Sequence, residues 1–248
     1  MRTAIAHWAA ILTVGVFTSA VAAPVASAHD LMPDLGMARL SDFRIDKLSG
    51  GRRVLRYSTT IVNVGTGAFE LHGVRTSTSA MSAAQRIFNS DGAFRDVVTP
   101  GTLVFGGDGH NHWHVNHLET SDLVKLDNGN RSATGAKRGF CFWDNVAFRL
   151  TLPSAPQNVA YRSTGCGGID SSTVAMGLSV GWGDEYPATL PDQYIDITNV
   201  TPGHYRLSVT ADAQNWFAET NEANNTTWVD VQLRQQGQPR ILGYGPTA

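Results

Sequence analysis

Short segments rich in β-branched and aromatic residues, separated by turn-forming residues, recur along this chain and constrain its fold. The segments 85–88 and 93–98 flank Asn-Ser-Asp-Gly, a pattern typical of a β-hairpin. Segment 54–64 ends at Gly-Thr-Gly, a turn after which 68–71 can run back alongside it as a second strand. Segment 194–198 and the alternating residues Tyr205, Leu207 and Val209 suggest another hairpin, with its turn at Pro202-Gly203. Further strands are expected at 123–126 and 227–233. Helical periodicity never exceeds a turn or two, so the sequence predicts an all-β antiparallel β-sandwich with long functional loops.

The first 28 residues resemble a signal for export. Arg2 precedes an apolar stretch over 9–16, and Ala26-Ser27-Ala28 has the small-x-small form of a signal-peptidase site. The apolar stretch is short for a membrane anchor, and no other stretch approaches a spanning length. We therefore expect residues 1–28 to be removed near Ala28, leaving a secreted single domain over 29–248 without a membrane span. Its tail, 235–248, is rich in Gln, Gly and Pro and is expected to be loosely ordered.

Charge and cysteine content narrow the function further. The formal net charge is −2, whereas a nucleic-acid-binding surface requires a basic surplus, so no nucleic-acid partner is expected. The two cysteines are Cys141 and Cys166. Because an exported chain meets oxidising conditions, we expect them to form a disulfide. Two free thiols that help to load a metal are the alternative.

Four of the eight histidines lie in the run 110–117. Strand alternation would put His110, His112 and His114 on one face and His117 out of phase with them. A flat strand would hold the outer two Cα atoms roughly 13 Å apart, so the run must curl, and the Gly-Gly-Asp-Gly stretch at 106–109 can bend. Imidazoles without thiolates suit copper, zinc, nickel or iron. The alternative is a solvated polar strand whose histidines bind nothing.

Three segments together resemble the lysyl oxidase family. The His-Asn-His-Trp-His run at 110–114 resembles the family's copper-binding run, and 135–141, which contains Lys137, resembles the segment holding the lysine of its built-in quinone. The segment 177–198 places Tyr186 where the family has the quinone's tyrosine. Weaker similarity extends from 32–35 to 224–225, and the chain is similar to secreted bacterial members of this family.

The resemblance implies a copper-dependent amine oxidase. Copper would be bound by His110, His112 and His114, and a lysine tyrosylquinone would form from Lys137 and Tyr186. With oxygen, such an enzyme converts a primary amine, either a peptidyl lysine or a small amine, to an aldehyde with release of ammonia and hydrogen peroxide. Lys137 would have to lose its proton before its amine could add to the ring. Asp184, Asp122 and His117 could each be the catalytic base or be structural.

The sequence departs from the family pattern in two places. Gly109 stands where the animal enzymes have a cysteine immediately before the first copper histidine. Cys141 and Cys166 match family cysteines whose usual partners are absent here, so a bond between them requires a rearranged pairing.

Two other functions remain open at this stage. One is a secreted copper-binding β-sandwich that sequesters or delivers metal without turnover. The other starts from His29, which after cleavage would present an amino group and an imidazole together, as in the copper brace of polysaccharide monooxygenases; the following 30–33 does not resemble that family. Without the resemblance, Lys137 would be interpreted as a solvated surface lysine and Tyr186 as a packed loop tyrosine.

Overall fold

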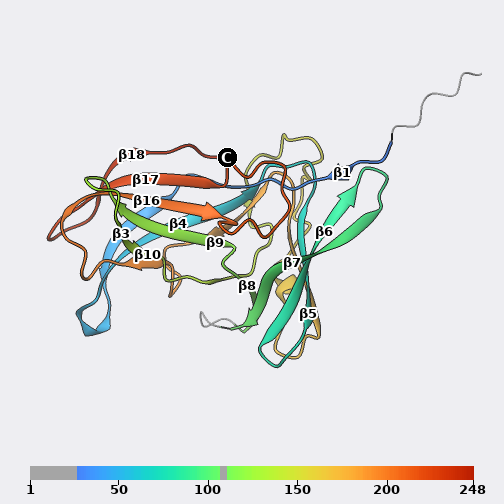
Figure 1. Ribbon diagram of the computed structural model, residues 1–248, viewed down its shortest axis with the longest axis horizontal. Helices are drawn as coiled ribbons and strands as arrows, with labels where there is room; N and C mark the ends of the chain where they lie inside the picture. The colour runs from blue at the N-terminus through green and yellow to red at the C-terminus, as the bar shows by residue number, and fades with distance from the viewer. Residues whose placement is uncertain (1–26, 107–110) are drawn as a thin grey trace, which may run out of the picture.

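The computed structural model describes residues 27–106 and 111–248, and its strands form three antiparallel sheets (Figure 1). The first sheet contains, in order, β11 (Gly139–Phe140), β8 (Trp113–Asn116), β7 (Phe94–Phe105), β6 (Ala80–Asn89), β5 (Phe69–Arg75) and β13 (Thr173–Leu178), with β1 (Asp30–Leu31) paired to β6. The second contains β10 (Arg131–Thr134), β9 (Glu119–Lys125), β16 (Gly203–Ala211), β17 (Thr226–Leu233) and β18 (Arg240–Tyr244). The third contains β12 (Val146–Ala147), β14 (Trp182–Tyr186), β4 (Arg53–Asn63) and β15 (Tyr194–Asp196), with β2 (Leu35–Met37) and β3 (Ser41–Lys47) also paired to β4.

The described helical structure is limited to two short 3₁₀ turns, Ser49–Gly51 and Ser163–Cys166. The predicted all-β sandwich is therefore confirmed. Within the described ranges, no helix is long and apolar enough to cross a membrane. Residues 1–26, which carry most of the predicted export signal, lie outside these ranges, as does His110.

Alternation of side chains explains how the second and third sheets pack. In β16, Tyr205, Leu207 and Val209 are buried, whereas the residues between them are more exposed. Leu55 and Ile61 of β4 belong to the same hydrophobic core as these β16 side chains. Nearly every residue of β4 is buried, because this strand is covered on both faces. In Figure 1, β9, β16 and β17 accordingly lie over β3 and β4.

One predicted hairpin is confirmed and two are wrong. β6 and β7 pair around the 89–92 turn, with Phe88 opposite Phe94. β4, however, does not pair with β5, because β5 lies between β6 and β13 in the first sheet. β15 pairs with β4, whereas β16 lies between β9 and β17, so the chain changes sheets between them. Alternating hydrophobicity identifies which side chains face the core, but it does not identify the neighbouring strand.

The C-terminal segment is more regular than the sequence predicts. β18 pairs with β17, and the backbone N–H of Ala248 donates to the carbonyl of Met37 at 3.1 Å. Ile241 packs against the core. The edge of β17 therefore supplies hydrogen bonds to the tail, and the core supplies an apolar contact. Together they order a segment that its Gln, Gly and Pro content suggested would be loosely ordered.

Candidate functional site

A cavity of about 690 Å³ brings together side chains that are far apart in the sequence. It is lined by Asn111, His112, His114, Lys137, Cys141, Trp143, Asn145, Glu185, Tyr186, Pro187 and Leu190. Of the predicted site residues, His112, His114, Lys137 and Tyr186 therefore share one cavity, beside one of the two cysteines. His110 lies outside the described residues.

The two described histidines of the predicted metal site are adjacent. The ring centroids of His112 and His114 are 4.4 Å apart. His114 lies on β8 and is almost fully buried, and its Nδ1 is 3.1 Å from the carbonyl oxygen of Gly106. A carbonyl oxygen can only accept, so Nδ1 carries a hydrogen, and in the neutral ring Nε2 carries the lone pair. This is the orientation in which a histidine is held as a metal ligand by a backbone carbonyl.

The strand next to β8 leaves room for His114. Gly139 of β11 pairs opposite Asn116 of β8. A Cβ at position 139 would lie 2.9 Å from the Cβ of His114, closer than real Cβ contacts allow. The glycine therefore permits the close approach of the two strands that fixes the histidine.

His117 is separated from the other two histidines, as its phase predicts. It lies in the turn after β8 with φ 56°, and its ring is nearly perpendicular to that of Trp216, with the ring centroids 6.4 Å apart. Burial lowers its pKa, and the charge of Arg138 adds to this effect. It lines a second, polar cavity of about 320 Å³ together with Asp122, rather than the one that contains His112.

Lys137 is buried, so the interpretation of a solvated surface lysine is wrong. Its residue exposure is 8%, and its Nζ lies 3.7 Å from Oδ1 of Asp192. The same Nζ is 5.2 Å from the ring centroids of both Phe140 and Tyr186. Lys137 lines the main cavity and also the second, polar one, so its side chain forms part of the wall of both.

Tyr186 ends β14, and its ring is held from two sides. The hydroxyl donates a hydrogen bond to the carbonyl of Cys141 at 3.0 Å, and the ring meets Phe140 edge to face at 5.0 Å. Cys141 is joined to Cys166, which confirms the predicted disulfide; both thiols are consumed, so the free-thiol alternative is wrong. The backbone that the disulfide anchors is thus also the acceptor for the tyrosine hydroxyl.

Two buried carboxyl groups lie near these residues without lining the cavity. Asp184 is fully buried, and this burial raises its pKa well above the usual range, while a backbone hydrogen bond from Trp143 and the Lys137 charge oppose the shift. The side-chain amide of Asn145 donates to Asp184. Glu119 of β9 has its pKa raised to about 7 by burial, against the opposing hydrogen bond from Thr59 and the charge of Lys137.

Sequence reasoning missed Glu119 and Asp192. Glu119 could have been found from strand alternation, because it lies on the same buried face of β9 as Ser121 and Leu123. Asp192 lies in an irregular loop before β15, where no periodicity indicates direction. Asp122, which the sequence offered as a possible base, lies on the opposite face of β9 and forms an ion pair with Arg131 at 3.4 Å.

A second acidic group was also missed. Carboxylate oxygens of Asp212, Glu219 and Glu222 lie within 4.8 Å of one another. Asp212 accepts hydrogen bonds from the backbone N–H groups of Trp216 and Phe217 at 3.0 and 2.9 Å. Glu219 accepts from the backbone N–H of Leu35, so it joins the loop before β17 to β2. This acidic group is separate from the residues that line the main cavity.

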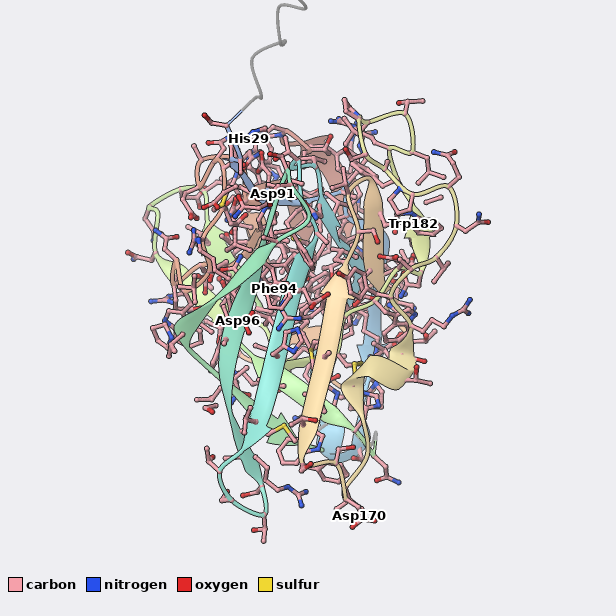
Figure 2. The ribbon with its side chains drawn as sticks, turned by 90° about the vertical axis from the view of Figure 1, so that its right-hand side faces the viewer. His29, Asp91, Phe94, Asp96, Asp170 and Trp182 are labelled. Carbon is pink, nitrogen blue, oxygen red and sulfur yellow. A yellow bond between two sulfur atoms is a disulfide. The ribbon has the colours of Figure 1, made fainter. Side chains whose placement is uncertain are left out.

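His29 lies at neither of these places. Its backbone N–H and its Nδ1 both contact the Ser90 hydroxyl, at the turn between β6 and β7 (Figure 2). That turn is at the far end of β7 from Phe105, which pairs with Trp113 beside the two cavity histidines. The copper-brace alternative therefore does not involve His112 or His114.

Comparison with known proteins identifies the family. The model of the lysyl oxidase family matches residues 84–241. Lysyl oxidase homolog 4 of Mus musculus is 29% identical over 177 residues, 71% of this chain, and protein-lysine 6-oxidase of Gallus gallus is 29% identical over 124 residues, 50% of this chain. The matches span 18% and 26% of those two relatives' own lengths. Since the family match covers more than half of the chain and includes every described residue of the predicted site, this chain belongs to the lysyl oxidase family.

Proposed function

We propose that the chain is a secreted copper-dependent amine oxidase that uses a lysine tyrosylquinone made from its own Lys137 and Tyr186. The observation that carries this proposal is the placement of the Lys137 amine, 5.2 Å from the centre of the Tyr186 ring, in the cavity that His112 and His114 also line. The names of the relatives, which include protein-lysine 6-oxidase, support oxidation of a primary amine.

The described histidines fit a copper site. His112 and His114 offer imidazoles 4.4 Å apart, one of them oriented by the Gly106 carbonyl, and His110 would supply a third. Bound copper would supply, with oxygen, the oxidation of the tyrosine ring. Sulfur is an unsuitable ligand here, since the cysteine that lines the cavity is consumed in a disulfide.

The chain's own residues would prepare the tyrosine and the lysine for joining. The Cys141 carbonyl holds the Tyr186 hydroxyl, and Phe140 packs against both the ring and the lysine amine. Fixing two groups in one cavity raises their effective concentration far above that of separated reactants. Asp192, 3.7 Å from the lysine amine, balances its charge.

The proposed reaction takes a primary amine, oxygen and water to an aldehyde, ammonia and hydrogen peroxide. Trp143, Pro187 and Leu190 give the cavity an apolar wall on which an alkyl chain can pack. Peptidyl lysine and small alkyl amines both offer such a chain.

Mass spectrometry of copper-loaded protein tests the proposal without a substrate. After aerobic incubation with copper, a digest is expected to yield one cross-linked peptide containing Lys137 and Tyr186, and the intact protein should react with hydrazines. Tyr186→Phe should abolish both signals and keep copper binding, because phenylalanine lacks the hydroxyl that the oxidation requires. His112→Ala should lower copper affinity by at least about tenfold.

The controls separate two outcomes. Lys137→Met keeps the length of the side chain but lacks the amine, so it should bind copper and give no cross-link. If fully copper-loaded wild-type protein shows neither cross-link nor hydrazine reactivity, the oxidase proposal fails. A copper-binding protein without turnover would then be the better description.

A further inference from the structure

We propose that Glu185 makes this site selective for amines that carry a second positive charge, as a straight-chain diamine does. The inference rests on the proposed amine oxidation and concerns its substrate. Among the described residues that line the main cavity, Glu185 is the one carboxylate. It directly precedes Tyr186 on β14, so it lies next to the proposed reaction centre.

No neighbouring side chain in the described part of the chain balances the charge of Glu185. Within the described residues, Glu185 takes part in no ion pair, and its side chain is exposed. The cationic residue of the cavity wall, Lys137, has Asp192 within 3.7 Å. An unbalanced carboxylate in a mostly apolar wall attracts a cation and disfavours a neutral alkyl end.

The backbone at Glu185 is fixed, although its side chain reaches solvent. Its N–H donates to Oδ1 of Asn145 at 2.8 Å, and the amide of the same asparagine donates to the buried Asp184. Glu185 also pairs with Thr60 of β4. The carboxylate is therefore presented from a rigid strand, which is the kind of element that supports selectivity.

Strand geometry indicates which charge of the substrate Glu185 would bind. Adjacent residues on a strand point to opposite faces, so the Glu185 carboxylate and the Tyr186 ring diverge. An amino group at the ring would thus lie away from the carboxylate, and the cation at Glu185 must be a second one, farther along the molecule. The alkyl chain between the two charges would pack on Trp143, Pro187 and Leu190.

Binding in the Tyr186→Phe background tests this inference without turnover. The probes are cadaverine and pentylamine, which have the same five-carbon chain and differ by one ammonium group. Calorimetric titration of metal-free protein should show tighter binding of cadaverine. Adding Glu185→Gln should reduce the cadaverine-to-pentylamine affinity ratio by about threefold to tenfold, the range expected for one partly exposed ion pair. Glu185→Asp, which keeps the charge, should restore part of the ratio.

Asp91→Asn is the matched control, since it removes the same charge from an exposed turn. Asp91 lies at the β6–β7 turn beside His29 (Figure 2), roughly 35 Å along β7 from the strand end near the cavity. The affinity ratio should not change in this variant. The inference would be overturned if the affinity ratio fell equally in Asp91→Asn and Glu185→Gln, or if the parent showed no preference for cadaverine. Either result could arise without a contact between the substrate and Glu185.

Turnover of the copper-loaded enzyme without the Tyr186 substitution provides the second arm. Glu185→Gln should lower the ratio of kcat/KM for cadaverine over pentylamine, mainly through KM. An equal loss of kcat for both amines would instead indicate that the carboxylate acts on the reacting atoms, and this too would overturn the inference. If the cross-link never forms, the oxidase proposal fails, whereas the binding arm still decides the role of Glu185.

Discussion

The Lys137 amine is a nearly buried cation whose surroundings are acidic. Asp192 lies 3.7 Å from Nζ, and the charge of Lys137 also acts on the buried carboxyl groups of Glu119 and Asp184. Two unit charges about 4 Å apart attract each other by about 4 kcal/mol at an effective dielectric constant of 20, and the desolvation of both groups offsets much of this. The net contribution of the pair to stability is therefore expected to be modest.

A double-mutant cycle of Lys137→Met and Asp192→Asn measures that contribution. In metal-free protein, each single variant should be less stable than wild type, because it removes the attraction between Nζ of Lys137 and Oδ1 of Asp192. We expect a coupling energy of about 1 to 2 kcal/mol from urea unfolding. Additivity of the two changes would contradict the prediction and assign the stabilisation of Lys137 to other groups.

Strands were predictable where one face is buried. Leu207 and Val209 of β16 show the alternation directly, and β6 and β7 have a turn sequence that joins neighbours. The partners of β4 could not be predicted, since nearly every residue of this strand is apolar or buried and its hydrogen bonds go to strands distant in the sequence. Register and order of strands depend on these long-range contacts.

The candidate site was predictable only where its residues are close together in the sequence. His112 and His114 are two residues apart on one short stretch, so their proximity follows from local geometry. Lys137 and Tyr186 were placed by the family resemblance, because nothing in their neighbourhoods gives a direction. Asp192 acts through a loop that only the folded chain brings to Lys137.

The disulfide is expected to stabilise the segment that follows β11. It joins residues 25 apart in sequence, and the chain-entropy estimate for a loop of that length is about 3.5 kcal/mol. Replacing both Cys141 and Cys166 by serine should lower the free energy of unfolding by about that amount, seen as a lower urea midpoint.

Thiol labelling supplies the control for this prediction. Denatured, unreduced wild-type protein should contain no reactive thiol. A double-serine variant as stable as the wild type would show that the constraint on the unfolded chain is balanced by other effects.

At the scale of the whole molecule, the acidic group connects β2 with the residues just before β17. Glu219 accepts from Leu35 near the N-terminus, and Asn225, at the edge of β17, donates to the same carboxyl group at 3.0 Å. Burial raises the pKa of Glu219 from its usual 4.5 to about 9, with the charges of Glu222 and Asp212 adding to the shift. The folded state therefore favours the protonated carboxyl group.

Stability should consequently fall as pH rises. Since the pKa is raised on folding, the contribution of Glu219 is complete below 4.5 and is lost as pH increases toward about 9. In chelator-treated protein, Glu219→Gln should remove a decline of about 1 to 2 kcal/mol over this range, an amount reduced because the side chain is partly exposed. Denaturant midpoints across this pH range would measure it, and an identical profile in the variant would refute it.

The position of Lys137 between two cavities has a practical consequence. Its side chain contributes to the wall of the apolar cavity beside Tyr186 and to the wall of the polar cavity beside His117. Truncation to alanine is expected to open a passage between them, which would admit water and small solutes to the tyrosine from a second side. Loss of activity in the alanine variant would therefore have two causes, the missing amine and the new access of solvent to the tyrosine. Methionine at the same position removes the amine and still fills the space between the two cavities.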